Sequence, residues 1–144
     1  MTTSIDSNII IALWWQQDPV NRVAAQLLRQ AQRGGWMVVS APVFAELMGD
    51  PNRNETELGE FFAETGISVD WVLDEALWRK AGKAYQGYIQ RRRSSSGTAP
   101  RRILADFLIG AHASVRGFAL LTLDRRLYAA ALPKLQVISA GSRS

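Results

Sequence analysis

Five acidic residues stand in apolar surroundings, where a charged side chain is costly unless a partner satisfies it. They are Asp6 in SIDSNII, Glu46 in VFAELM, Asp70 in SVDWV, Asp106 in ILADFLIG and Asp124 in LTLDRR. Most of the other acids lie on a polar helix face, in a turn, or just before a helix that they can cap. The five therefore need a chemical explanation of their own.

The predicted placement of these acids separates four of them from Asp70. Asp6 and Asp124 each end an apolar strand and precede a helix, and ligands of open α/β sheets bind beyond the carboxyl ends of the strands. Asp106 lies near the start of its helix, on a face that carries apolar residues, and Glu46 also shares a helix face with an apolar neighbour. Asp70 is instead predicted to end an edge strand or to pair with a nearby Lys or Arg.

Converging carboxylates repel each other, and their pKa values rise unless a cation lies between them. Oxygen-only ligands favour Mg²⁺ or Mn²⁺ over zinc. Such an ion polarises a phosphoryl oxygen and lowers the pKa of a bound water, which is the chemistry of phosphate-ester hydrolysis. A helix cap or a buried ion pair is the better explanation for any one of these acids alone. The four together favour a metal site.

The elements that would position these acids alternate along the chain. Strands are predicted up to Asp6 and over residues 36–40, 67–72, 118–123 and 135–139. Helices are predicted after Asp6 and over residues 18–35, 41–49, the later part of 51–66, 74–93, 101–117 and 124–132, with a loop at 94–100. This alternation predicts an α/β fold with a mainly parallel central sheet of about four to five strands, flanked by helices.

Bulk composition narrows the class of protein. The 144 residues suit one domain that spans residues 1–144. The net charge of +4 makes a polyanionic partner plausible. The chain has no cysteine, which excludes disulfides and thiolate metal sites and favours the cytoplasm. The N-terminus lacks the basic region of a signal peptide, and the early apolar run is too short to span a membrane.

Four segments, in order, resemble one known family. SIDSNIIIAL, APVFAEL, ILADFLIGAHA and LLTLDRRLYAAALP are similar to segments of the PIN-domain ribonucleases, and more narrowly of the VapC toxins of type II toxin–antitoxin modules. The resemblance covers nearly the whole chain and implies a PIN-like three-layer domain. The four acids of the family fall on Asp6, Glu46, Asp106 and Asp124. Its small polar residue falls on Asn8, and its hydroxyl residue falls on Thr122.

The resemblance also implies a function. A VapC-like chain is expected to be an endoribonuclease that uses Mg²⁺, with Mn²⁺ as a substitute, to hydrolyse RNA with a metal-activated water. Asp6 and Asp106, joined by Asp124, would hold metal directly or through water, and Glu46 would orient the water or bind a second ion. The expected partners are RNA, a VapB-like antitoxin whose C-terminal segment lies over the active site, and a second copy of the chain. No membrane partner is expected.

Some other residues invite functional roles. His112, the single histidine, is predicted to be a polar residue on a helix flank, because it lies roughly 120° round the helix from Asp106. The five tryptophans are predicted to serve core or dimer packing rather than base stacking. Arg125, with Arg101, Arg102 and Arg126, flanks the inward acids and is a candidate for phosphate contacts. Arg91–Arg93 is predicted to be a solvated helix end.

The sequence is also compatible with three other functions. A housekeeping PIN nuclease in RNA processing would need no antitoxin. A catalytically idle RNA- or protein-binding module could keep the same fold, although the intact set of four acids argues against it. A phosphatase that forms a phospho-aspartate is disfavoured, because the DSN segment lacks the second acid of a D-x-D motif.

Overall fold

A computed structural model describes residues 1–97 and 101–140. Within them the chain forms five strands and seven helices in alternation. The strands are β1 (Thr2–Ile5), β2 (Trp36–Ser40), β3 (Ile67–Asp70), β4 (Ala119–Leu121) and β5 (Val137–Ile138). The helices are α1 (Ser7–Trp14), α2 (Asn21–Gly34), α3 (Ala41–Met48), α4 (Glu55–Thr65), α5 (Glu75–Ser94), α6 (Leu104–Arg116) and α7 (Arg125–Ala131).

The five strands form one sheet in the order β3-β2-β1-β4-β5, and every pairing is parallel. The predicted α/β class with a parallel sheet is therefore confirmed. The chain leaves β1 toward β2 and β3, and it later returns to place β4 on the opposite side of β1. This reversal creates a switch point between β1 and β4, where ligands of open α/β sheets usually bind.

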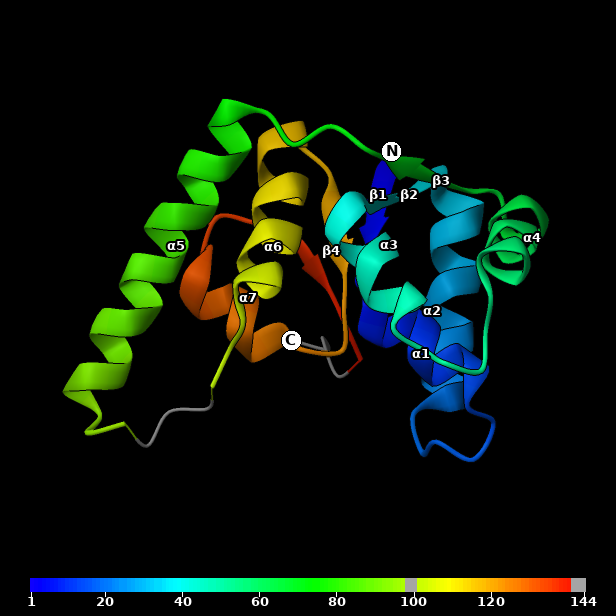
Figure 1. The fold of residues 1–144 in the computed structure, drawn as a ribbon, viewed down its shortest axis with the longest axis horizontal. Coiled ribbons are helices and arrows are strands. Elements are labelled where there is room, and N and C mark those ends of the chain that lie inside the picture. Colours follow the sequence, from blue (N-terminus) through cyan, green and yellow to red (C-terminus); the bar gives the residue numbers. More distant parts are fainter. Residues whose placement is uncertain (98–100, 141–144) are drawn as a thin grey trace.

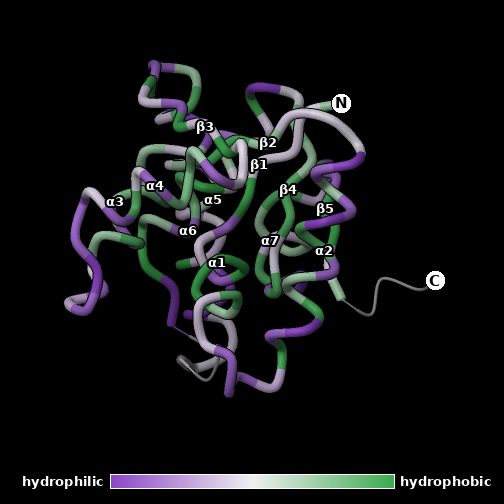
Figure 2. The backbone as a smooth tube through the Cα atoms, turned by 90° about the vertical axis from the view of Figure 1, so that its right-hand side faces the viewer, coloured by the Kyte–Doolittle hydropathy of each residue, from purple (hydrophilic) through white to green (hydrophobic). Residues whose placement is uncertain are grey.

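Helices cover both sides of the sheet (Figure 1). Helix α5 packs against α6 and α7, whereas α1 packs against α2 and α3. Helix α3 also contacts α6, which brings the two groups together near the end of β1. In Figure 2 hydrophobic residues follow the central strands, and hydrophilic residues gather in outlying loops. No helix within the described ranges is both long and apolar enough to cross a bilayer.

Several helix ends follow the predicted signals. The Asp74 carboxylate accepts a hydrogen bond from the Leu77 amide, so it caps α5 as predicted. Gly117 ends α6 with a φ of 74°, a left-handed conformation that glycine adopts without steric cost. Ser40 occupies the N-cap position of α3, but its hydroxyl makes no capping hydrogen bond.

Other predicted boundaries are displaced by a few residues. Helix α6 begins at Leu104 rather than at residue 101, and β4 is shorter than the predicted strand at 118–123. Helix α2 begins at Asn21, after a turn in which Asp18 accepts a hydrogen bond from the Val20 amide. The predicted loop at 94–100 lies outside the described residues at positions 98–100.

The tryptophans differ from the prediction. Trp14 is half-buried and packs edge-on against Phe61. The other four are exposed in the single chain, so core packing is wrong for them, whereas packing in a dimer stays a prediction. These exposed residues are Trp15, Trp36, Trp71 and Trp78.

Candidate active site at the carboxyl ends of β1 and β4

The end of β1 places Asp6 inside the protein. Ile5 pairs with Leu121 across the sheet, and the Asp6 amide donates to the Leu121 carbonyl at 2.9 Å. The Asp6 side chain is only 5% exposed, and its Oδ2 accepts hydrogen bonds from the Thr122 hydroxyl at 2.8 Å and the Tyr128 hydroxyl at 3.1 Å. These two donors fix the orientation of the carboxylate and leave Oδ1 facing the rest of the site.

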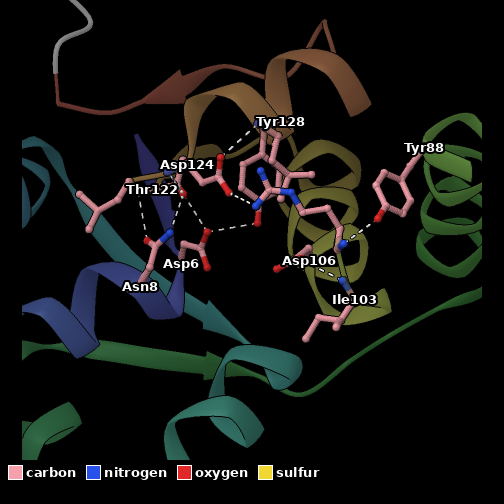
Figure 3. Close-up of polar contacts among 11 residues, drawn as sticks. Asp6, Asn8, Tyr88, Ile103, Asp106, Thr122, Asp124 and Tyr128 are labelled. Atoms are coloured by element: carbon pink, nitrogen blue, oxygen red, sulfur yellow. Dashed lines mark hydrogen bonds and ion pairs between the residues drawn. The ribbon is translucent and has the colours of Figure 1, made fainter. Parts of the chain in front are cut away.

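A second set of hydrogen bonds ties the ends of the two strands together (Figure 3). The Asn8 amide donates to Thr122 Oγ1 at 3.3 Å and accepts from the Leu123 amide at 3.1 Å. Thr122 Oγ1 also accepts from the Asp124 amide at 3.0 Å. Asn8 and Thr122 therefore connect the segments that carry Asp6 and Asp124.

Glu46 and Asp106 approach from two helices. Glu46 on α3 is half-buried, and its Oε1 accepts a hydrogen bond from the Ser7 hydroxyl at 2.8 Å. Asp106 lies in the first turn of α6, where its Oδ2 accepts from the Ile103 amide at 3.2 Å. In Figure 3 the Asp106 carboxylate points toward Asp6. Both helix acids lie near enough to Asp6 for their charges to raise its pKa.

Each oxygen of the Asp124 carboxylate has a partner in the structure. Its Oδ1 accepts a hydrogen bond from the Leu127 amide and so caps α7, and its Oδ2 forms an ion pair with the Arg102 guanidinium at 2.5 Å. The carboxylate at the end of β4 is therefore both a helix cap and the partner of a cation, and the cation in this structure is a protein side chain.

Electrostatic repulsion links the acids into one cluster. Burial raises the pKa of Asp6 to about 6, with further increases from the charges of Glu46 and Asp106, while the hydrogen bonds from Thr122 and Tyr128 oppose the rise. Burial also raises the pKa of Glu46 and of Asp106. Asp106 contributes to the rise at Glu46, and Asp124 contributes to the rise at Asp106. These four carboxylates are close enough to disfavour one another's charge.

The donor chemistry of the cluster fits a hard divalent cation. It offers only carboxylate oxygens, and within the described residues Glu46 Oε2 and Asp106 Oδ1 have no hydrogen-bond partner, while Asp6 Oδ1 has one weak contact with Ser7 at 3.5 Å. In the part of the chain that the structure describes, no three acidic or histidine side chains already converge as ligands of one ion.

Sequence reasoning missed two hydroxyl groups of the site, those of Ser7 and Tyr128. Tyr128 lies one helical turn after Asp124 on α7, and that spacing was the available signal. Its ring reaches Asp6 because Gly110 of α6 leaves space: a Cβ there would lie 2.9 Å from two ring carbons of Tyr128. Burial and the nearby carboxylates hold the pKa of Tyr128 far above its usual range, so its hydroxyl stays a donor.

Two predicted residues lie outside the cluster. The exposed Arg125 donates to the Val137 carbonyl at 3.2 Å, and its role toward substrate stays a prediction.

His112 is fully buried, so its predicted place on a polar helix flank is wrong. Its ring contacts Asp70 at 2.9 Å, and Arg116 pairs with the same carboxylate at 3.1 Å. Asp70 ends the edge strand β3 and pairs with an arginine, as predicted.

Comparison with known proteins identifies the family. Residues 4–132 match the model of the PIN domain. The chain therefore belongs to the PIN domain family, whose members are typically metal-dependent nucleases. A search of curated protein sequences gave no significant match.

Solved structures with a similar fold come from toxin–antitoxin systems. VapBC2 from Rickettsia felis, bound to a promoter DNA fragment, is 17% identical, with a TM-score of 0.69 over 96% of this chain and 98% of that chain. VapBC-1 from nontypeable Haemophilus influenzae is 19% identical, with a TM-score of 0.67 over the same shares of 96% and 98%. VapC20 from Mycobacterium tuberculosis, a toxin that cleaves the sarcin–ricin loop, is 16% identical, with a TM-score of 0.59 over 89% of this chain and 94% of that chain.

The raised pKa of Asp6 leads to a prediction about the free energy of unfolding. Because its pKa is about 6 in the folded protein and 3.8 ordinarily, folding favours the protonated form, and stability falls as the pH rises from the ordinary value to the folded value. Asp6→Asn removes this cost and keeps an oxygen that can accept from Thr122 and Tyr128. We expect the metal-free variant to be about 1–3 kcal/mol more stable than wild type at pH 7.5.

Urea unfolding in EDTA at pH 7.5 and pH 5.0 measures this difference. The advantage of Asp6→Asn should shrink at pH 5.0, where wild-type Asp6 is largely protonated. Glu60→Gln, on the exposed surface of α4, is a matched control and should change stability little at either pH. An Asp6→Asn variant that is less stable than wild type at pH 7.5 would contradict the assigned electrostatic cost.

Proposed function

We propose that this protein is a Mg²⁺-dependent endoribonuclease that acts as the toxin of a type II toxin–antitoxin module. The observation that carries the proposal is the electrostatically linked set of Asp6, Glu46, Asp106 and Asp124 at the switch point of a PIN fold. The structural neighbours, which come from toxin–antitoxin complexes, support the toxin role.

In this proposal Asp6 and Asp106 hold the metal, with Asp124 joining them once its ion pair opens. The bound ion would stabilise charge on the phosphoryl oxygens and lower the pKa of a water. Thr122 and Tyr128 keep the Asp6 carboxylate oriented, and Asn8 keeps the two strand ends in register. Exact placement of ligands of this kind contributes strongly to catalysis.

Glu46 is placed to orient the attacking water. Its Oε1 is held by Ser7, and its raised pKa makes it a better proton acceptor than an ordinary glutamate. The water oxygen forms a bond to phosphorus while the bond from phosphorus to the 3′ oxygen breaks. The water proton leaves to Glu46 or solvent, and the 3′ oxygen gains a proton. The products are a 5′-phosphate and a 3′-hydroxyl.

The proposed partners follow from charge and from the relatives. A basic rim that includes the exposed Arg101, Arg125 and Arg126 can bind RNA phosphates. A VapB-like antitoxin is the proposed inhibitor, since a basic side chain on its tail could replace the metal's charge among the acids. The exposed tryptophans are consistent with a homodimer.

Expression in a bacterial host tests the toxin role. The wild-type protein should arrest growth, and co-expression with the cognate antitoxin should restore it. Asp6→Asn is the matched control, because it keeps the size and shape of the side chain but removes a proposed ligand. We expect this variant to accumulate in folded form without arresting growth.

Two results would count against this role. Normal growth at high yield of the wild-type protein would favour a housekeeping PIN nuclease or an idle binding module. Arrest that persists with Asp6→Asn would mean that toxicity does not come from the carboxylate site.

A further inference from the structure

Arg102 is anchored beside the carboxylate cluster by its main chain. Its amide donates a hydrogen bond to the Tyr88 hydroxyl at 2.7 Å. Tyr88 is a buried residue of α5, and its ring packs against Phe107 of α6. The backbone of Arg102 is therefore held between α5 and the start of α6.

The side chain of Arg102 reaches into the cluster. Its guanidinium forms the ion pair with Asp124 and donates a hydrogen bond to that carboxylate. Its charge also opposes the rise in the pKa of Asp106. Arg102 therefore neutralises part of the negative charge on the side of the site that Asp106 and Asp124 form.

Neighbouring cations do not share this position. Among the ion pairs of the described residues, Arg102 is the one cation paired with a member of the four-acid cluster. Arg101 is adjacent in sequence and exposed, and Arg125 donates to a main-chain carbonyl instead. The ion pair with Asp124 thus depends on the position of Arg102, since Arg101, one residue earlier, does not form it.

We propose that Arg102 is an internal counter-ion of the carboxylate site, which a divalent cation displaces from Asp124, and that the displaced guanidinium then binds the scissile phosphate of RNA. A divalent cation and a guanidinium beside the same carboxylate repel each other, so binding of the ion weakens the ion pair between Arg102 and Asp124. Arginine also matches a phosphate with two parallel hydrogen bonds. The inference rests on the proposed nuclease function and assigns a substrate-binding residue to the same site.

The two proposed roles of Arg102 affect different measurements in an Arg102→Met variant. Loss of the competing guanidinium changes Mn²⁺ affinity, and loss of the phosphate contact changes the rate of RNA cleavage. Without its competitor, Mn²⁺ should bind roughly 5- to 20-fold more tightly in the absence of RNA, because Asp124 is no longer occupied. RNA cleavage at saturating Mn²⁺ should nevertheless fall roughly 10- to 100-fold, because a donor to the reacting phosphate is lost. A purely structural ion pair would lower both Mn²⁺ affinity and activity.

The experiment is a Mn²⁺ titration followed by electron paramagnetic resonance of the free ion, with RNA cleavage measured in parallel. Arg101→Met is the control, because it removes the same charge from the neighbouring position and should leave Mn²⁺ affinity within about twofold of wild type. Arg102→Lys keeps the charge, so its Mn²⁺ affinity should stay near that of wild type while cleavage falls. This second variant also serves if Arg102→Met does not fold.

The outcomes separate this inference from the proposed function. If wild type binds Mn²⁺ and cleaves RNA, but Arg102→Met binds Mn²⁺ no more tightly than Arg101→Met, the inference is overturned and the nuclease proposal stands. An Arg102→Lys variant with full activity would likewise overturn the paired hydrogen bonds from Arg102 to the phosphate. A wild-type protein that neither binds Mn²⁺ nor cleaves RNA would overturn both.

Discussion

Asp106→Asn should reduce RNA cleavage by on the order of 10³-fold while the protein stays folded. The substitution removes a charge that faces Asp6 and that the proposed metal would need. The asparagine oxygen can still accept the hydrogen bond from the Ile103 amide that begins α6. Because burial and repulsion raise the pKa of Asp106, its neutral replacement should not weaken the fold.

Cleavage of a labelled RNA by purified protein, together with a circular dichroism spectrum, measures both parts of this prediction. Glu75→Gln is a matched control, since Glu75 also lies in the first turn of a helix but is exposed and pairs with Arg79 on its own helix. The control should keep full activity. Wild-type rates in an Asp106→Asn preparation free of contaminating nuclease would remove Asp106 from the proposed site.

Removal of divalent metal should stop cleavage, and Mg²⁺ or Mn²⁺ should restore it. Three of the four acids carry pKa values raised by burial and by one another, so a bound cation would relieve a repulsion already present in the fold. Ca²⁺ should bind but restore little activity, because its longer and looser coordination misplaces the attacking water. We expect EDTA to lower the rate by at least about 10²-fold.

A metal series tests this requirement. The protein is dialysed against EDTA, and each ion is then added back at equal concentration before RNA. Cleavage that continues undiminished in EDTA would point to a metal-free nuclease. Equal rates with Ca²⁺ and Mg²⁺ would contradict the proposed demand for tight octahedral coordination.

Much of the fold could be predicted from local sequence patterns. The acids at strand ends were the informative signal, because a parallel sheet brings the carboxyl ends of its strands to one edge. Asp6 and Asp124 therefore come close together although they lie far apart in the sequence. Glu46 and Asp106 were predicted to face inward from the apolar residues on their helices, and the structure places both beside Asp6.

The residue at which α6 begins could not be predicted from the local sequence pattern. The helical pattern extends back to residue 101, but α6 begins at Leu104. The Arg102 amide bonds to Tyr88 of another helix, and the Ile103 amide bonds to the Asp106 side chain. These contacts depend on how α5 packs against α6, which no single segment encodes.

The burial of His112 was missed for a similar reason. Helical spacing correctly separates His112 from Asp106, but it does not show what covers each face. Helix α6 packs against α5, α3 and β4, and every residue from Phe107 to Ala113 is buried. The ion pair of Arg102 with Asp124 was likewise missed, because the two residues are brought together only by the completed fold.

The most direct test of the central claim is to locate a bound Mn²⁺ in a crystal of the wild-type protein by anomalous diffraction. We expect a peak among Asp6, Glu46, Asp106 and Asp124, within coordination distance of Asp6 and Asp106. The same soak of an Asp6→Asn crystal should give a weaker peak or none. A well-occupied peak elsewhere, with none at these four acids, would contradict the assignment of the carboxylate cluster as the metal site.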